Sequence, residues 1–297
     1  MELNRANLQA MTTGFQTVFN DAFAGVTPTS SRVAMEVPSN NTSEQYAWLG
    51  SMPRFREWLG SRVVQNLSVS DFTIKNKTFE MTVGVKRESI EDDSYGVFRP
   101  MIGQMGAEAK RHPDELVYSL LKGGFTGLCY DGQYFFDTDH PGYDAAGAIV
   151  SVSNMQAGAA TPWYLISARN FVKPLIFQKR RDYKFVAKDQ LTDDNVFDKD
   201  EFVYGVDARA NAGYGLWQLA HGSKAALDAT TFDAARTAMS SLRGPNGKSL
   251  GIVGDLLVVP PSLEGAGRRL LHNETAANGA TNEWKGTAEL LVVPDLA

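Results

Sequence analysis

The segment YFFDTDHPGY, residues 134–143, holds the side chains of this sequence that are best suited to metal or acid–base chemistry. Asp137, Asp139 and His140 stand within four positions, with Asp131 just upstream and the single cysteine, Cys129, close by. Carboxylates, imidazoles and thiolates are the usual ligands of transition metals, which take about three or four of them in a protein site. One hypothesis is therefore a metal-dependent hydrolase that uses Asp137, Asp139 and His140.

The surrounding pattern favours a turn over a metal site. The four histidines are scattered along the chain, and neither an HExxH nor a CxxC spacing occurs. On an extended strand Asp137 and Asp139 share one face while His140 points to the other, and Pro141 favours an extended His140. We therefore expect an Asp-rich turn whose carboxylates accept backbone N–H groups, and we expect no metal and no other cofactor.

Two further segments imitate functional motifs. RGPNGKSLG, residues 243–251, resembles a phosphate-binding loop, but Leu242 stands where the first glycine is required, and a helix precedes it where the motif has a strand. We expect a β-turn at residues 244–247. QKRRDYKF, residues 178–185, mixes basic and aromatic side chains and could bind single-stranded nucleic acid if its rings were exposed. An edge strand protected by positive charge explains it better, and the sequence predicts no catalytic residues.

Composition limits the function classes. A chain of 297 residues with 43% hydrophobic residues can bury a large core in one or two domains. The formal net charge of -5 and the pI near 5.5 give no overall basic field for nucleic acid. A single cysteine excludes an internal disulfide and suits a reducing compartment. The N-terminus is too polar for a signal peptide, and no apolar run is long enough to span a membrane.

The first 92 residues predict a helix, an arm and a hairpin. Apolar residues from 8 to 23, including Phe15 and Phe19, follow helical spacing, and residues 27–50 are rich in Ser, Thr, Asn and Pro, which predicts an extended arm outside the core. Strict alternation from Phe79 to Val85 predicts a strand. We expect it to pair with residues 69–74 in a long hairpin, with residues 75–77 at the turn. A two-stranded ribbon is marginal alone, so we expect its apolar face, Phe79 to Val85, to be covered only by a neighbouring copy of the chain.

The remainder of the chain alternates between helical and extended patterns. Helical spacing from residue 97 to 122 contains Pro113, which predicts either a kink or two consecutive helices. Strand patterns dominate residues 163–220. A helix over 232–242, capped by Thr230 with Asp233 reaching back, then precedes a strand at 254–259, a helix at 263–271 and a strand at 288–293. The fold class predicted is α+β.

Several long segments in this order resemble the Mu-like bacteriophage and prophage major head subunits. The matching segments are WLGSMPRFREWLGSR, IKNKTFEMTVGVKRESIEDD, PDELVYSLLKGGF, CYDGQYFFDTDHP, KPLIFQKR and YGVDARANAGYGLWQLA. The resemblance extends from about Trp48 to Leu271. It implies the Hong Kong phage-type major capsid fold. The N-terminal arm would be residues 1–50 and the extended hairpin loop residues 51–92. The peripheral domain, with a spine helix within 95–123 and a β-rich body, would be residues 93–228, and the axial domain residues 229–297.

The resemblance also implies a function and partners. The expected function is self-assembly into the icosahedral head of a tailed phage or prophage around double-stranded DNA, without enzymatic activity or sequence-specific DNA binding. The expected partners are other copies in pentamers and hexamers, a separate scaffold protein and a portal, with assembly in the bacterial cytoplasm and no membrane. The predicted subunit-interface residues are Ile74, Lys75, Asn76, Lys77, Phe79, Met81, Val83, Val85, Phe15 and Phe19.

Overall fold

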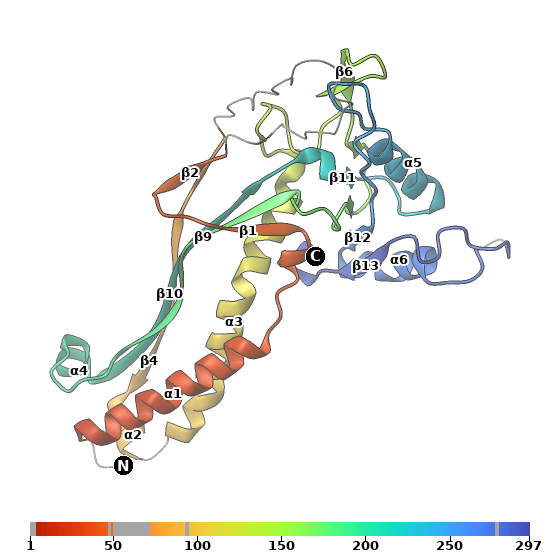
Figure 1. Ribbon diagram of the computed structural model, residues 1–297. Coiled ribbons are helices and arrows are strands. Elements are labelled where there is room, and N and C mark those ends of the chain that lie inside the picture. The colour runs from red at the N-terminus through yellow and green to blue at the C-terminus, as the bar shows by residue number, and fades with distance from the viewer. Residues whose placement is uncertain (1–3, 47–48, 50–71, 93–94, 277–278) are drawn as a thin grey trace.

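The computed structural model describes residues 4–46, 49, 72–92, 95–276 and 279–297. Figure 1 shows an elongated molecule: two long helices and a long sheet form one end, and a second body with shorter elements forms the other. The helices are α1 (Arg5–Gly25), α2 (Arg87–Glu91), α3 (Tyr95–Lys122), α4 (Asp194–Lys199), α5 (Ala229–Ser240) and α6 (Glu264–Leu271). The strands are β1 (Ala34–Pro38), β2 (Ser43–Gln45), β3 (Thr73–Lys75), β4 (Lys77–Lys86), β5 (His140–Tyr143), β6 (Ile149–Val152), β7 (Met155–Gln156), β8 (Trp163–Ile166), β9 (Leu175–Lys188), β10 (Glu201–Tyr214), β11 (Ala220–Ser223), β12 (Leu256–Val259) and β13 (Glu289–Val292).

Helix α1 confirms the predicted N-terminal helix and packs along α3. Asn4 caps its start by accepting a hydrogen bond from the Asn7 N–H. Phe15 and Phe19 lie on its buried stripe, 1% and 2% exposed. The two helices approach closely at Gly106, where an added Cβ would lie 2.3 Å from the Phe19 carbonyl oxygen. Glycine is therefore required at this crossing.

Strand β4 does not form the hairpin expected from the sequence. It pairs antiparallel with β10, from Lys77 opposite Ala210 to Lys86 opposite Glu201, in a sheet ordered β1-β9-β10-β4. Strand β3 pairs instead with β2, and residues 69–71 lie outside the described part. The hairpin prediction is wrong because the alternating pattern identifies a strand but not its partner, which comes from far along the chain.

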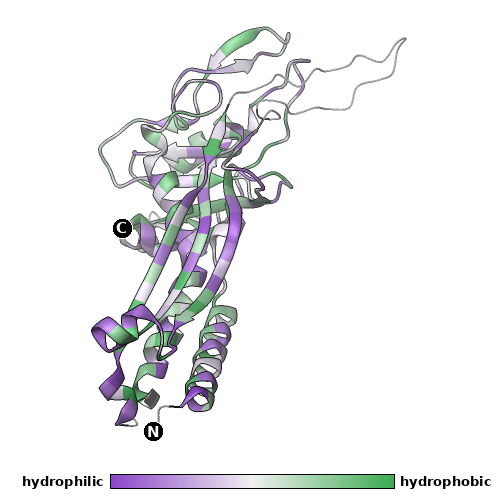
Figure 2. Ribbon diagram, turned by 90° about the vertical axis from the view of Figure 1, so that its left-hand side faces the viewer, coloured by the Kyte–Doolittle hydropathy of each residue, from purple (hydrophilic) through white to green (hydrophobic). Residues whose placement is uncertain are grey.

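The inner face of this sheet is covered by α1 and α3, which form one hydrophobic core. Figure 2 shows purple and green alternating along the long strands, as expected for a sheet with one covered face. We call this cluster the distal core. Its buried members are Leu8, Met11, Phe15, Phe19, Val85, Ile90, Ile102, Met105, Ala109, Phe185, Val196, Phe202, Tyr204 and Val206.

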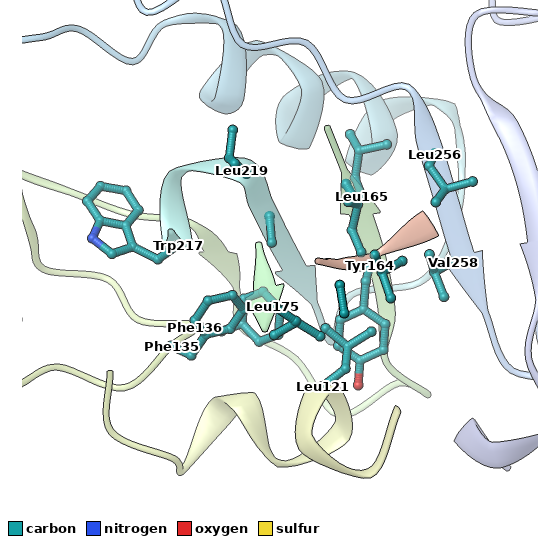
Figure 3. Close-up of a cluster of buried hydrophobic side chains, with 14 of the residues drawn as sticks. Leu121, Phe135, Phe136, Tyr164, Leu165, Leu175, Trp217, Leu219, Leu256 and Val258 are labelled. Atoms are coloured by element: carbon teal, nitrogen blue, oxygen red, sulfur yellow. The ribbon is translucent and has the colours of Figure 1, made fainter. Parts of the chain in front are cut away.

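A second core, called here the proximal core, fills the other body. It is built around a five-stranded sheet ordered β13-β12-β8-β11-β7, and Figure 3 shows Leu165, Trp217 and Leu256 among its buried side chains. Helix α5 begins at an Asp228 cap that forms a capping box with Thr231, so the predicted Thr230 cap is wrong by two positions. The turn expected at residues 244–247 is confirmed, because the Gly247 N–H donates to the Gly244 carbonyl.

Helix α3 joins the two cores. Its helical conformation continues through Pro113, so the alternative of two consecutive helices is wrong. Residues 27–50 also differ from the expected free arm: β1 joins β9, and Val33, Ala34, Tyr46 and Leu49 are buried in the proximal core. None of the described helices combines the length and apolar character that a bilayer-spanning segment needs.

Candidate functional site

The residues predicted for a hairpin tip lie in a different setting. Asn76 is only 6% exposed, and its side-chain amide donates to the Ser39 hydroxyl and the Asn41 carbonyl. Gln178 donates to the Asn76 side-chain oxygen at 2.7 Å and to the Ile74 carbonyl at 3.1 Å. Ile74 and Asn76 therefore fasten the N-terminal segment to the sheet. Lys75 and Lys77 are exposed on either side.

The apolar face predicted for β4 is covered by the same chain. Val85 is buried in the distal core, and the half-buried Met81 and Val83 pack against it. Phe79 contacts the ring of His112 on α3, with ring centroids 4.4 Å apart. The reasoning that only a neighbouring copy could cover this strand is therefore wrong.

Phe15 and Phe19 are likewise used inside the chain. Phe15 packs edge-on against Tyr204 with ring centroids 5.2 Å apart, and Phe19 packs on Phe185 at 5.3 Å. Both rings lie between α1 and the sheet, so the helical stripe read from the sequence marks an internal core face.

A groove of about 880 Å³ runs beside α3 between the two cores. His112 lies in its wall with Nδ1 2.6 Å from the Tyr183 hydroxyl. Burial lowers the pKa of His112, and the nearby Glu115 carboxylate opposes part of this effect. The other charged lining residues are mostly acidic: Glu80, Glu108, Arg111, Asp114 and Asp295. The groove therefore separates the distal and proximal cores at the level of His112.

The residues of the opening motif separate into two roles. Asp137 accepts hydrogen bonds from the Tyr134 and Thr138 N–H groups at 3.1 and 2.7 Å. This is the turn predicted from the sequence. Asp139 is exposed and accepts a hydrogen bond from the Gln133 amide. Asp137, Asp139 and His140 do not converge on one point, so the metal triad of the hydrolase hypothesis is not formed among the described residues.

His140 instead joins two residues from the segment upstream. Its Nδ1 lies 2.7 Å from Asp131 Oδ2, and the Cys129 thiol donates to Asp131 Oδ1 at 2.9 Å. The imidazole is fully buried and stacks on Trp217 with ring centroids 4.1 Å apart. The sequence places Cys129 and Asp131 just upstream of the motif but does not predict their contact with His140, because Asp131 and His140 are separated by an irregular segment.

Burial and hydrogen bonding shift the pKa of two members of this cluster, Cys129 and Asp131. Burial, reinforced by the hydrogen bond to Asp131, raises the pKa of the Cys129 thiol far above its ordinary value. Burial alone would raise the pKa of Asp131, but hydrogen bonds from His140 and Cys129 outweigh it and hold that pKa below its ordinary value. One ligand-type atom from each residue lies within 4.8 Å of the others. Asp131 holds both other side chains, whereas His140 Nε2 has no hydrogen-bond partner among the described residues.

The basic segment 178–185 lies on β9 and keeps its rings inside. Phe177 and Phe185 are buried, and Tyr183 packs against the distal core, while Arg180 and Lys184 are exposed. Beyond Lys179 the described strands pair with β9 only through β10. This is the charged edge strand that the sequence favoured, and its aromatic rings are not available to stack on bases.

Comparison with known structures defines the class of protein. The chain matches a subunit of the "Procapsid of bacteriophage JBD30" with TM-score 0.88 and 41% identity, covering 99% of this chain and 100% of that one. It matches the "Bacteriophage JBD30 capsid" with TM-score 0.81 and 31% identity over the whole of both chains. The protein is therefore a phage capsid subunit of the α+β Hong Kong phage type, which confirms the predicted fold class.

Sequence comparison gives the particular family. The model of the family "Mu-like prophage major head subunit gpT" matches residues 8–296. The "Major capsid protein" of Escherichia phage Mu is 40% identical over 98% of this chain and 99% of that protein. The "Mu-like prophage FluMu major head subunit" of Haemophilus influenzae is 39% identical over 97% of each. The chain belongs to the Mu-like prophage major head subunit family and is a structural subunit of the capsid shell; the metal hydrolase hypothesis finds no support.

Proposed function

We propose that this chain assembles as pentamers and hexamers into an icosahedral head that encloses double-stranded DNA. The observation that carries the proposal is a set of large apolar side chains left in solvent at separate points of the surface. Phe171 is 98% exposed, Phe197 85%, Val97 75% and Ile149 73%. Aromatic side chains such as Phe171 and Phe197 are enriched at protein–protein interfaces, which supports burial of these points against partners.

The role we propose is structural, and the partners are mainly other copies. The cluster of Cys129, Asp131 and His140 is buried. The net charge of -5 disfavours tight binding of DNA phosphates, which suits a shell that encloses DNA without sequence-specific binding. Assembly would take place in the bacterial cytoplasm, with a separate scaffold protein and a portal contributed by the phage.

The domain division that we propose follows the two sheets. Strands β7, β8 and β11, from the predicted peripheral segment, lie in one sheet with β12 and β13. We therefore propose that the axial domain includes these three strands together with α5 and α6, and that the peripheral domain consists of α3, β4, β9 and β10. The loop proposed at 51–92 lies outside the described residues from 51 to 71.

The proposed subunit interface keeps only part of the predicted set. Lys75 and Lys77 are exposed, and Phe79, Met81 and Val83 remain partly exposed although their face packs on the same chain, so these five remain candidates. Ile74, Asn76, Val85, Phe15 and Phe19 pack within the chain. We propose that these five support the subunit's own core.

The proposal is tested by imaging the protein under conditions that permit assembly. The chain is expressed alone and together with the other head proteins of its phage, then examined by sedimentation and negative-stain electron microscopy. We expect closed shells or rings. A chain that remains monomeric in both settings at high concentration contradicts the proposal.

A further inference from the structure

The far end of the β9–β10 ribbon carries an unusual separation of charge. Figure 1 shows α4 at this end, away from the body that contains α5 and α6. Residues 189–201 contain six acidic residues and one lysine, a net of -5, which equals the formal net charge of the whole chain. Residues 179–188, which lead into this tip, contain five basic residues and one aspartate, a net of +4. The tip and the strand beside it are therefore oppositely charged surfaces on one projection.

Helix α4 presents an acidic face with an aromatic centre. Asp194, Phe197 and Asp198 stand at positions i, i+3 and i+4, which lie together on a helix surface. All three are exposed, Phe197 by 85%, whereas Val196 is buried in the distal core. The inward contact of α4 is thus satisfied by Val196, and this outer face has no apolar cover within the chain.

Strand β9 presents a basic row with an aliphatic centre. Lys184, Val186 and Lys188 alternate with the core-facing Phe185 and Ala187, so they share the outer face of the sheet. All three are exposed, Val186 by 52%. The row has the order base, aliphatic, base, and α4 has the order acid, aromatic, acid.

The charges on both surfaces are free within the described part of the chain. Asp194, Asp198, Lys184 and Lys188 take part in none of the ion pairs found there. Asp207 stands opposite Lys184 on β10, but its carboxylate is paired with Arg181. Two complementary surfaces therefore remain unsatisfied on each copy.

We infer that α4 of one copy packs on β9 of a second copy in the shell, with Phe197 against Val186 and the two aspartates against Lys184 and Lys188. This inference rests on the proposed assembly into a shell and names one contact within it. Because each copy carries both halves, the contact can repeat from copy to copy. A nucleic acid would be attracted to the basic row but repelled by the acidic tip beside it, so a second copy fits the pair of surfaces better.

The decisive experiment reverses the charges on α4, the charges on β9, and then the charges on both surfaces together. A tip variant carries Asp194→Lys and Asp198→Lys, a strand variant carries Lys184→Glu and Lys188→Glu, and a swapped variant carries all four changes. Like charges facing each other should lower particle yield by more than about tenfold in either single set. The swapped variant restores opposite charges and should recover particles. An Asp233→Lys and Glu283→Lys variant, changed at exposed acids elsewhere, controls for altered net charge.

The measurements distinguish a failure of the α4–β9 contact from a failure of the proposed shell assembly. Particles are counted by sedimentation and electron microscopy in the setting where the unmodified chain assembles, and urea unfolding confirms that each variant folds. Loss in both reversed variants with recovery in the swapped one supports the contact. Normal assembly of either reversed variant, or a swapped variant as defective as its parents, overturns it while leaving the shell function in place.

A cross-linking measurement does not depend on the charge variants. Cys129 is the single cysteine, so Cys129→Ser provides a background for Val186→Cys with Phe197→Cys. Assembled particles of this variant should give disulfide-linked oligomers on non-reducing gels, whereas either new cysteine alone should give none. Particles that form without such oligomers overturn the contact.

Discussion

His221 is a buried base whose two ring nitrogens lack hydrogen-bond partners in the described part of the chain. Burial lowers its pKa from an ordinary 6.5 to about 4. Between these values the unfolded chain binds a proton more readily than the folded chain. The stability contributed by a neutral His221 is therefore complete above about pH 6.5 and is lost as the pH falls towards 4, by about 3 kcal/mol.

His221→Leu should remove this part of the pH dependence. Leucine has no proton to bind, so the drop in unfolding free energy between pH 7 and pH 4.5 should shrink relative to the unmodified chain. Urea unfolding at the two pH values measures the change. His272→Leu is the matched control, because His272 is exposed. An unchanged pH dependence in His221→Leu would show that this side chain is not the acid-sensitive group.

Asp131 holds Cys129 and His140 in the buried cluster and gives a second prediction. Asp131→Asn replaces one acceptor oxygen by an amide, which leaves the thiol or the imidazole N–H unpaired, and should cost about 2–3 kcal/mol. The free energy of unfolding in urea measures this cost. Cys129→Ser keeps a donor at the same place and should cost less than about 1.5 kcal/mol. Equal costs for the two variants would contradict a central role for the carboxylate.

Cys129 should also report on the state of the subunit. Burial raises the pKa of its thiol, and only the thiolate reacts rapidly with disulfide reagents. We expect slow labelling in the folded chain and fast labelling in urea, measured by the absorbance of the released thiolate. Fast labelling of the folded chain would mean that the cluster opens readily.

At the scale of the elements, the α1–α3 crossing makes a sharp prediction. A Cβ at Gly106 would lie 2.3 Å from the Phe19 carbonyl oxygen, so Gly106→Ala must push the two helices apart and should cost about 1–3 kcal/mol. At Gly103 on the same helix, the nearest atom would be 3.5 Å away. Gly103→Ala should be neutral or stabilising by up to about 1 kcal/mol. Urea unfolding of both variants distinguishes a close crossing from a general effect of glycine.

The helices and strands were largely predictable because their apolar spacing is local. The apolar stripe that includes Phe15 and Phe19 predicted helix α1, and the alternation of apolar and polar residues from Phe79 to Val85 predicted strand β4. Strand partners were not predictable, because nothing near β4 indicates pairing with Glu201–Ala210. A long alternating strand needs a partner, and the nearest candidate in the sequence is not always the one used.

The candidate sites show the same limit. The turn-forming role of Asp137 could be predicted from its type and spacing, whereas the contact of His140 with Asp131 depends on how β5 folds back. Lys75, Asn76 and Lys77 resembled an exposed turn. Asn76 is instead buried, and it donates hydrogen bonds to Ser39 and Asn41, more than 30 positions away in the sequence. A polar triplet between strands indicates a turn only when both strands belong to one hairpin.

At the scale of the whole molecule, two hydrophobic cores are joined by α3 and by the long β9–β10 ribbon. The distal core uses Ile102, Met105 and Ala109 of α3, and the proximal core uses Val117, Tyr118 and Leu121. The segment between them borders the groove and includes His112 and Pro113. The buried members of the two cores form separate clusters, so we expect each core to open as a separate cooperative unit.

Hydrogen exchange tests this organisation with a pair of matched core truncations. Phe202→Ala removes a ring from the distal core and should cost about 3–5 kcal/mol there, which speeds amide exchange in α1 and β4 while leaving β8 and β12 protected. Leu165→Ala should do the reverse, because its side chain lies in the proximal core. Faster exchange in both bodies from either change would mean that α3 couples them into one unit. Independent responses would show that the two cores unfold as separate cooperative units although α3 and the β9–β10 ribbon run through both.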